Sequence, residues 1–405
     1  MAAGDKFDRK LKITPSQLTA GVTSIHETST PADLTVGAIT DGQYLKRDGA
    51  NIVSAAVATS YPTAWYYADI SFAAKTVSAA ADRYKLLTAN VVQSDVGGVS
   101  LTLTAQATLD LSLEATWDTV AGTDYRTASN RAGKDFYVYL CQPGSGTTPV
   151  IKVSANATYP SGYNASTSRK VGGCHCLCVA AGTLSSNALT GYLAGDVLPA
   201  SVWDLKWRAT PAGNEGMVYD HKDGEWKDIY PPTSTGATTA SVYLTGTAVT
   251  VSRNWMDFTD DGAAVGKHLL TDASFQRGAA GSNEETNIAG SAFPAGTGGY
   301  SDTAGRRMIS SIGMESCCGH IWQWLDEQSN KWDFTASWGW YDLPGSKGSL
   351  YNGAGSAGTG DVKLLAGGAW YYGSWCGSRS RHANFYRWGT STDVGARFAA
   401  RHLTK

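Results

Sequence analysis

The chain has 405 residues, with 33 basic and 35 acidic side chains and a net charge of -2. This near-neutral balance excludes a general polyanion binder, because nucleic-acid binding relies on a basic surface, so we expect no nucleic-acid partner. Charged residues make up only 17%, whereas the chain has 46 glycines, 14 tryptophans and 20 tyrosines. This composition favours turn-rich β structure over long helices.

The sequence shows no targeting or membrane-spanning segment. No apolar stretch follows the first residues, so we expect no secretory signal, and no run of about 18 apolar residues indicates a membrane span. The seven cysteines are an odd number in a chain without an export signal. We therefore expect free thiols in a reducing compartment rather than a disulfide scaffold.

The chain divides into three predicted parts, and the first two are β-rich. Residues 1–60 are polar and carry Asp-Gly pairs at 41–42 and 48–49, which favour hairpin turns between short strands. Because so short a segment makes a poor isolated core, we expect other chains to stabilise it. Residues 61–205 predict a β-sandwich, since 99–104 and 136–140 alternate with period two. A further strand is predicted at 202–208, with a domain boundary near 206.

Residues 206–405 predict a mixed α+β domain. The best helix candidates are 253–265 and 271–280, in which Trp255, Phe258 and Phe275 would face a core. Thr271 and Asp272 are suitable residues for the start of the second helix. After residue 281 the chain is predicted to be mostly loop, with glycine-rich stretches that separate short aromatic clusters.

The C-terminal run from 367 to 398 is the strongest functional signal. It contains Trp370, Tyr371, Tyr372, Trp375, Phe385, Tyr386 and Trp388 among glycines, serines and arginines. No helical or strand period sorts these rings onto one buried face. Large amphipathic rings among small polar residues are typical of binding surfaces. We expect a display surface with Trp370 as its buried floor; the alternative is the core of a small irregular domain.

Three landmarks of this run resemble a known fold. They are the Gly-Gly-x-Trp motif at 367–370, the Gly-Ser-Arg motif at 377–379 and the Val-Gly-Ala-Arg-Phe motif at 394–398. Together they resemble the closing signature of the C-type lectin-like fold shared by formylglycine-generating enzymes and diversity-generating-retroelement variable proteins. Residues 266–275 and 318–324 are similar to that fold's helix start and its Trp-x-Trp strand.

The resemblance extends upstream to the phage major-tropism-determinant family. Residues 160–175, 203–208 with Gly216 and Met217, and 226–230 are similar to that family's β-sandwich, domain junction and following strand. The implied fold class is mainly β: an intertwined N-terminal β segment at 1–60 that trimerises the chain, a β-sandwich at 61–205, and an α+β C-type lectin-like domain at 206–405.

The resemblance implies a function as well as a fold. Members of this family are receptor-binding proteins at the tail-fibre tip. The implied partners are therefore a host-surface receptor, either protein or glycan, the other chains of a homotrimer, and other tail proteins. The implied location is the virion, after synthesis in the host cytoplasm.

The resemblance also implies the ligand-binding positions, which in the family lie between the landmarks. Tyr386 and Trp388 are added because they are aromatic and close by. The expected set is Ala369, Tyr371, Tyr372, Gly373, Trp375, His382, Asn384, Phe385, Tyr386, Trp388, Gly389, Ser391, Asp393 and Val394. The predicted anchors are Tyr371, Tyr372, Trp375, Phe385 and Tyr386, and the predicted polar selectivity residues are His382, Asn384 and Asp393.

Three alternatives remain open. The chain could be a structural virion protein whose aromatic run is buried against a neighbouring subunit, or a prophage-encoded variable protein with another ligand. A formylglycine-generating-type oxidase would need a reactive cysteine pair near the C-terminus, where Cys376 stands alone. The adjacent Cys317 and Cys318 would point apart on a strand, which is poor for joint metal ligation. We therefore expect no enzymatic activity.

No motif indicates a cofactor or a resident metal. Cys174, Cys176 and Cys178 alternate around His175 and would share one face of a strand, where we expect structural thiols. The acidic turns at 220–224 and 260–262 offer oxygen ligands to calcium but fit no complete loop motif. We expect solvated turns there, with calcium binding left open.

Overall fold

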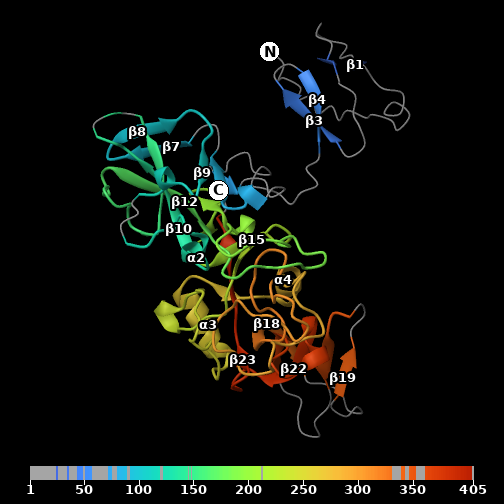
Figure 1. Ribbon diagram of the computed structural model, residues 1–405. Coiled ribbons are helices and arrows are strands. Elements are labelled where there is room, and N and C mark those ends of the chain that lie inside the picture. The colour runs from blue at the N-terminus through green and yellow to red at the C-terminus, as the bar shows by residue number, and fades with distance from the viewer. Residues whose placement is uncertain are drawn as a thin grey trace, which may run out of the picture. The chain divides into compact units, whose positions relative to one another are not determined.

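A computed structural model shows two compact units, Met1–Pro62 and Thr63–Lys405 (Figure 1). It describes residues 80–88, 92–118, 122–144, 146, 148–210, 213–330, 339–342, 346–352 and 361–403, together with short strands before residue 80. In the first unit these strands are β1 (Ser24–Ile25), β2 (Leu34–Thr35), β3 (Gln43–Asp48) and β4 (Asn51–Ala56). β3 and β4 are antiparallel, and Asp48, the first residue of the second Asp-Gly pair, ends β3 and pairs with Asn51. The short strands are as predicted, whereas trimerisation stays a prediction.

The second unit begins with three groups of antiparallel strands, which Figure 1 shows in light blue to green. The first group is β5 (Phe72–Ala74), β6 (Lys85–Thr88) and β9 (Thr108–Asp110), and the second is β7 (Val92–Val96) with β8 (Val99–Leu103). The third has the order β11 (Val150–Ser154), β10 (Asp135–Cys141), β12 (Ser168–His175) and β13 (Trp203–Asp204). The short helices here are η2 (Ala80–Asp82), η3 (Glu114–Thr116), α2 (Ala128–Arg131) and η4 (Pro199–Ser201).

The alternation of β10 explains why this part folds in layers. Phe136, Val138 and Leu140 enter an apolar cluster with residues of β6, β7 and β8. Tyr137 and Tyr139, which lie between them, enter a separate cluster on the opposite face. Successive side chains of a strand point to opposite faces, so β10 packs apolar or aromatic side chains on both of its faces. The predicted strands near 99–104 and 136–140 are confirmed.

The predicted strand at 202–208 is wrong in extent, because β13 (Trp203–Asp204) is the strand within it and the chain enters another sheet at Ala209. β13 pairs with β12, whereas β14 (Ala209–Thr210) pairs with β24 (Phe398–His402). The Asp204 carboxylate accepts hydrogen bonds from the backbone N–H groups of Lys206 and Trp207, at 2.7 and 2.6 Å. Such an Asp turn satisfies the backbone locally and ends the strand.

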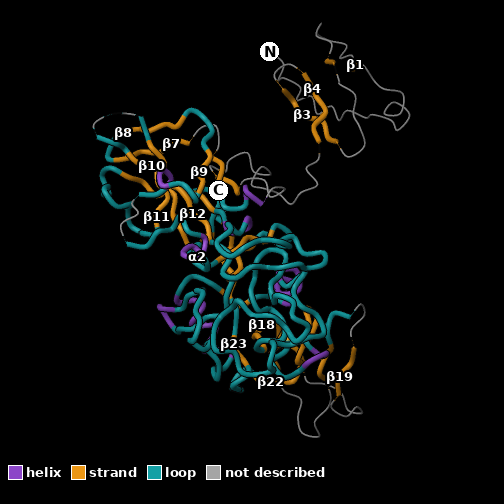
Figure 2. The backbone as a smooth tube through the Cα atoms, in the orientation of Figure 1, coloured by secondary structure: helices purple, strands orange, loops and turns teal. Residues whose placement is uncertain are grey.

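The remaining chain forms two sheets, and consecutive strands near the C-terminus, β23 (Val394–Gly395) and β24, belong to different ones. The first sheet consists of β14, β24, β16 (Glu225–Asp228) and β15 (Met217–Asp220), with β17 (His268–Leu269) also on β24. The second has the order β19 (Gly339–Asp342), β20 (Ser349–Asn352), β22 (Gly377–Tyr386), β21 (Asp361–Gly367), β18 (Trp322–Asn330) and β23 (Val394–Gly395). Short 3-10 turns are η5 (Gly236–Thr238) and η6 (Gly373–Trp375). Loops make up most of this part (Figure 2).

Two predicted helices are confirmed as α3 (Trp255–Ala264) and α4 (Asp272–Gly278). α3 begins with a capping box, in which Asn254 and Asp257 satisfy each other's backbone N–H groups. α4 begins as predicted, with the Thr271 hydroxyl accepting from the Ser274 N–H. Phe258 and Phe275 are fully buried, so both helices pack their apolar side on the core.

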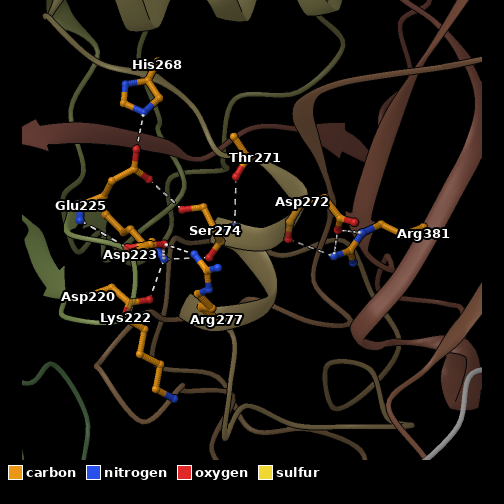
Figure 3. Close-up of polar contacts among 11 residues, drawn as sticks. Asp220, Lys222, Asp223, Glu225, His268, Thr271, Asp272, Ser274, Arg277 and Arg381 are labelled. Atoms are coloured by element: carbon orange, nitrogen blue, oxygen red, sulfur yellow. Dashed lines mark hydrogen bonds and ion pairs between the residues drawn. The ribbon is translucent and has the colours of Figure 1, made fainter.

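Polar contacts fix α4 between the two sheets (Figure 3). Lys227 is fully buried and donates to the carboxylates of Asp220 and Asp223 and to the Ser274 carbonyl, at 2.7, 2.6 and 2.7 Å. At the other side of the helix, the Asp272 carboxylate pairs with Arg381 of β22. The turn at 220–224 is therefore not solvated as predicted, because its acids neutralise a buried cation.

The seven cysteines are free and buried. Cys174 and Cys176 enter the apolar cluster of β10, but Cys178 enters a different cluster. The prediction that all three share one face is wrong for Cys178, because β12 ends at His175. In the part of the chain that the structure describes, no group of three or more His, Cys, Asp or Glu residues is placed to hold a metal.

A buried polar chain joins the first strands to the C-terminal part of the second unit. His175 lies 2.9 Å from Asp135 through Nδ1 and 3.0 Å from the Tyr230 hydroxyl through Nε2. Asp135 also accepts from the backbone N–H of Gly216. These hydrogen bonds provide partners for buried polar groups, which would otherwise destabilise the folded state. They also connect β10 and β12 to the segments beyond β14. Among the described residues, no helix is long and apolar enough to cross a membrane.

Candidate functional site

Two glycines shape the turn that carries the aromatic run out of the sheet. β21 ends at Gly367, and both Gly367 and Gly368 have positive φ, at 94° and 88°. A Cβ on Gly367 would lie 2.3 Å from the Cys317 carbonyl oxygen, and one on Gly368 would lie 2.6 Å from the Cys376 sulfur. Only glycine fits such positions without strain. The turn places Trp370, Tyr371 and Tyr372 beyond the end of the strand.

A stack of three tryptophans links the core to the surface of the site. Trp322 is 1% exposed and stacks with Trp340, with ring centroids 6.3 Å apart and planes at 11°. Trp340 in turn stacks with Trp375 at 4.8 Å and 9°. Trp375 is 40% exposed, so the outermost ring of the stack faces solvent. Tyr372 packs edge-on against both Trp322 and Trp340.

The expected floor, Trp370, does not have that role. Trp370 is only partly buried and makes edge-on contacts with Phe293 at 5.0 Å and Tyr371 at 5.1 Å. Asn287 donates to its carbonyl oxygen. The prediction of a Trp370 floor is therefore wrong: Trp322 and Trp340, which come from other strands, lie beneath the rings.

Tyr371 is an exposed ring whose hydroxyl has a buried hydrogen-bond partner. Its side chain is 51% exposed, yet its hydroxyl donates to Oδ2 of Asp393 at 2.5 Å. Ser391 donates to the other carboxylate oxygen. Partial burial and the bond to Asp393 raise the pKa of Tyr371, so its hydroxyl remains a donor at neutral pH.

β22 contributes a second set of side chains. His382 packs against Trp322, Tyr351 and Phe385, with centroid distances of 5.6, 5.2 and 5.9 Å. Burial lowers the pKa of His382 to about 4, so the ring is neutral at pH 7. Within the described residues, His382 Nδ1 and Asn384 Oδ1 have no hydrogen-bond partner. Both atoms are buried, so they are unsatisfied polar groups within the site and are not exposed to solvent.

The turn after β22 carries another stacked pair. Tyr386 and Trp388 lie 5.0 Å apart with planes at 8°. Trp388 is 60% exposed. The Gly389 N–H donates to the Tyr386 carbonyl at 2.8 Å and closes the turn. The rings are thus presented by a defined loop rather than by a free terminus.

The fourteen expected site residues fall into three groups by exposure. The exposed residues are Tyr371, Trp375 and Trp388, and the half-buried residues are Tyr372, Gly373, His382, Asn384, Phe385, Tyr386, Gly389 and Ser391. Ala369, Asp393 and Val394 are buried. The backbone of Ala369 forms a β-bridge with His320, and Val394 of β23 pairs with Trp322 of β18. Because both residues are buried, neither side chain is available to a ligand. The buried Asp393 accepts a hydrogen bond from the Tyr371 hydroxyl.

Sequence reasoning missed Phe293 and Trp340. Phe293 is 38% exposed and belongs to the glycine-rich stretch after residue 290, far from the aromatic run in sequence. It extends the ring contacts beyond Trp370. In the sequence, Phe293 is simply an aromatic residue in a predicted loop, and nothing near it indicates that it contacts Trp370.

The landmark Arg397 is structural. It is 1% exposed and donates through Nε to Gln323 Oε1 and through NH1 and NH2 to the carbonyls of Asp228 and Glu315. These bonds tie the segment before β24 to both sheets. The polar partners compensate the desolvation of the guanidinium.

The cysteines near the site have the properties of structural thiols. Burial raises the pKa of Cys317 to about 11 and that of Cys376 to about 12, and it also raises the pKa of Cys318. Reactive and metal-binding cysteines act as thiolates. These three groups are protonated at neutral pH, which does not favour thiolate chemistry here.

Comparisons with known proteins agree with this geometry. Residues 91–204 match the family model described as the Mtd second domain. The tail fiber receptor-binding protein of Bordetella phage BPP-1 is 26% identical over 329 residues, which cover 74% of this chain and 81% of that protein. The solved U1 variant of the Major Tropism Determinant matches with a TM-score of 0.60 at 23% identity, covering 83% of this chain and 84% of that one. The chain has the major tropism determinant fold.

A second solved structure supports the same assignment. The M1 variant of the Major Tropism Determinant matches with a TM-score of 0.59 at 23% identity, over 89% of this chain and 92% of that chain. The predicted fold class, mainly β with a C-terminal lectin-like part, is confirmed. The resemblance to the major tropism determinants is confirmed as well.

Proposed function

We propose that this chain is a phage tail-fibre receptor-binding protein, a non-enzymatic adhesin of the virion that binds a host-surface receptor. The receptor-binding region is the aromatic surface, defined as Phe293, Tyr371, Tyr372, Trp375, Phe385, Tyr386 and Trp388. The observation that carries the proposal is the exposure of Tyr371, Trp375 and Trp388 on turns fixed by the core. The relative from phage BPP-1 carries the name of a receptor-binding tail fibre protein.

The physical basis is the combination of exposure and order. Soluble proteins rarely expose contiguous apolar patches without a partner. Trp375 rests on Trp340, and Tyr371 is held by Asp393, so both rings present area with little rotamer freedom left to lose. Binding to rigid aromatic side chains saves the ordering entropy that flexible groups would lose.

The oligomeric part of the proposal concerns strength of attachment. We propose that residues 1–60 join three chains and that other tail proteins hold the trimer on the virion. Several linked sites convert weak single contacts into strong attachment, because later contacts form at high effective concentration. The receptor of this adhesin is a protein or a glycan.

Whole-cell binding tests the adhesin function. Fluorescently labelled full-length chain is applied to intact cells of a panel of bacterial strains, Bordetella included. We expect binding to at least one strain, and we expect Trp375→Ala to weaken it at least about 30-fold, the range of an interface hot spot. Leu193→Ala serves as the matched control, because Leu193 is 59% exposed but lies outside the aromatic surface.

Two results would contradict the proposal. One is the absence of binding to every strain. The other is equal binding by the Trp375→Ala variant and the unaltered chain. Thermal unfolding of each variant accompanies the assay, so that a loss of binding with an intact fold is separated from unfolding.

A further inference from the structure

Tyr371 combines two properties that rarely occur together. It lies in the turn between β21 and η6, outside any strand, and half of its side chain is exposed. A tyrosine in such a turn ordinarily samples several rotamers. Here the hydroxyl at the far end of the ring is bonded to Asp393, a residue 22 positions away. The ring is therefore held at both ends.

Asp393 is itself held firmly. Its backbone carbonyl accepts from the Trp322 N–H at 2.8 Å, which fixes the main chain against β18. Its side chain is 8% exposed, and its second carboxylate oxygen accepts from Ser391. The Ser391 carbonyl in turn accepts from the Ser252 N–H at 3.0 Å. The carboxylate thus belongs to the rigid part of the molecule.

The Asp393 carboxylate has hydroxyl partners rather than a cation. Among the described residues, no salt bridge to Asp393 is formed. The titratable group that faces it from β22 is His382, whose ring is neutral at pH 7. Hydrogen bonds to an ionised acceptor are about twice as strong as neutral ones. Tyr371 therefore gains a strong tether, and the acid has little exposed surface to offer a ligand.

We propose that Asp393 is a positioning residue that fixes the orientation of Tyr371 in the aromatic surface, so that positions 371 and 393 act as one unit in recognition. The role in recognition rests on the proposed receptor-binding function, whereas the positioning itself does not. A change at residue 393 then alters binding through Tyr371, without a contact between residue 393 and the receptor.

The positioning is tested without any receptor. The full-length chain is labelled with 3-fluorotyrosine, and the signal of residue 371 is identified as the one missing in Tyr371→Phe. In the unaltered chain we expect this signal not to titrate at the pH where exposed fluorotyrosines ionise, a pH that fluorine lowers below the ordinary tyrosine pKa of about 10. In Asp393→Ala we expect this signal to titrate at a lower pH than in the unaltered chain, and its line to report averaging between rotamers.

The controls separate positioning from folding. Asp260→Ala removes an exposed carboxylate outside the site and should leave the residue 371 signal unchanged. Asp393→Asn keeps a neutral acceptor and should give an intermediate shift. It also provides the measurement if Asp393→Ala fails to fold. An unchanged titration and line shape in both Asp393 variants would overturn the proposal.

A double-mutant cycle tests the link to recognition, with intact cells of the strain that binds the unaltered chain as the probe. Tyr371→Phe and Asp393→Ala should each weaken binding about 2- to 10-fold, the cost of reordering one side chain. The double variant should lose no more than the weaker-binding single variant. Multiplied losses would mean that Asp393 contacts the receptor itself. If the fluorine signal behaves as expected but no strain is bound, the receptor-binding function fails while the positioning stands.

Discussion

Two clusters of this chain are both rich in aromatic residues but differ in exposure. The junction cluster consists of Trp207, Tyr219, Trp226 and His402, and its Trp207–Tyr219 and Tyr219–Trp226 pairs lie 4.6 and 5.3 Å apart. Trp226 is fully buried there, whereas Trp375 of the aromatic surface is 40% exposed. The junction rings lie mainly on paired strands, and the exposed rings lie on turns beyond strand ends. A high density of aromatic residues therefore does not predict whether the rings are exposed; in these two clusters, exposure follows placement on turns.

The largest expected effect is in the junction cluster. Trp226→Ala should lower the free energy of unfolding by about 3–5 kcal/mol, because a fully buried ring leaves a cavity among its neighbours. Denaturant unfolding measures the change. Trp375→Ala is the comparison, and its loss of stability should be below about 1 kcal/mol. Equal losses would mean that the two clusters do not differ as described.

The pH dependence of stability distinguishes the rings beneath the aromatic surface. His382 has a folded pKa of about 4, below the unfolded value of about 6.5. Folding favours the neutral form of His382. The stability that this preference contributes is therefore complete above pH 6.5 and is lost as the pH falls toward 4. His382→Gln should reduce the loss of stability between pH 7 and 5 by about 2 kcal/mol.

Urea unfolding at pH 7, 6 and 5 provides the measurement for His382. Other acids and histidines change their charge in the same range, so the unaltered chain is the reference at each pH. An identical pH profile for the His382→Gln variant would show that this ring is not buried in its neutral form.

The smallest expected effect is at the edge of the aromatic surface. Phe293→Ala removes a ring that contacts Trp370, and we expect cell binding to weaken about 3- to 10-fold, the value of one aromatic pair. The unfolding temperature should change little, because the side chain is 38% exposed. Unchanged cell binding would show that Phe293 does not belong to the receptor-binding surface, which would then consist of residues of the C-terminal run alone.

Several elements could be predicted because their causes are local. Thr271 caps α4 through a residue three positions away, and Asn254 and Asp257 cap α3 in the same way. The alternation in β10 depends only on the period of a strand. The turn at 367–368 depends on two glycines with positive φ. The location of a binding surface in the C-terminal run stays a prediction that whole-cell binding tests.

The sequence by itself determined where helices begin, which strands alternate and which run carries the rings. Only the tertiary structure decided that Ala369 and Val394 point inward, that Trp370 is not the floor, and that Cys178 leaves the cluster of Cys174. Exposure depends on which distant segment covers a side chain. Trp322, Trp340 and Trp375 come from three separate parts of the chain, yet their stacking decides which ring meets solvent.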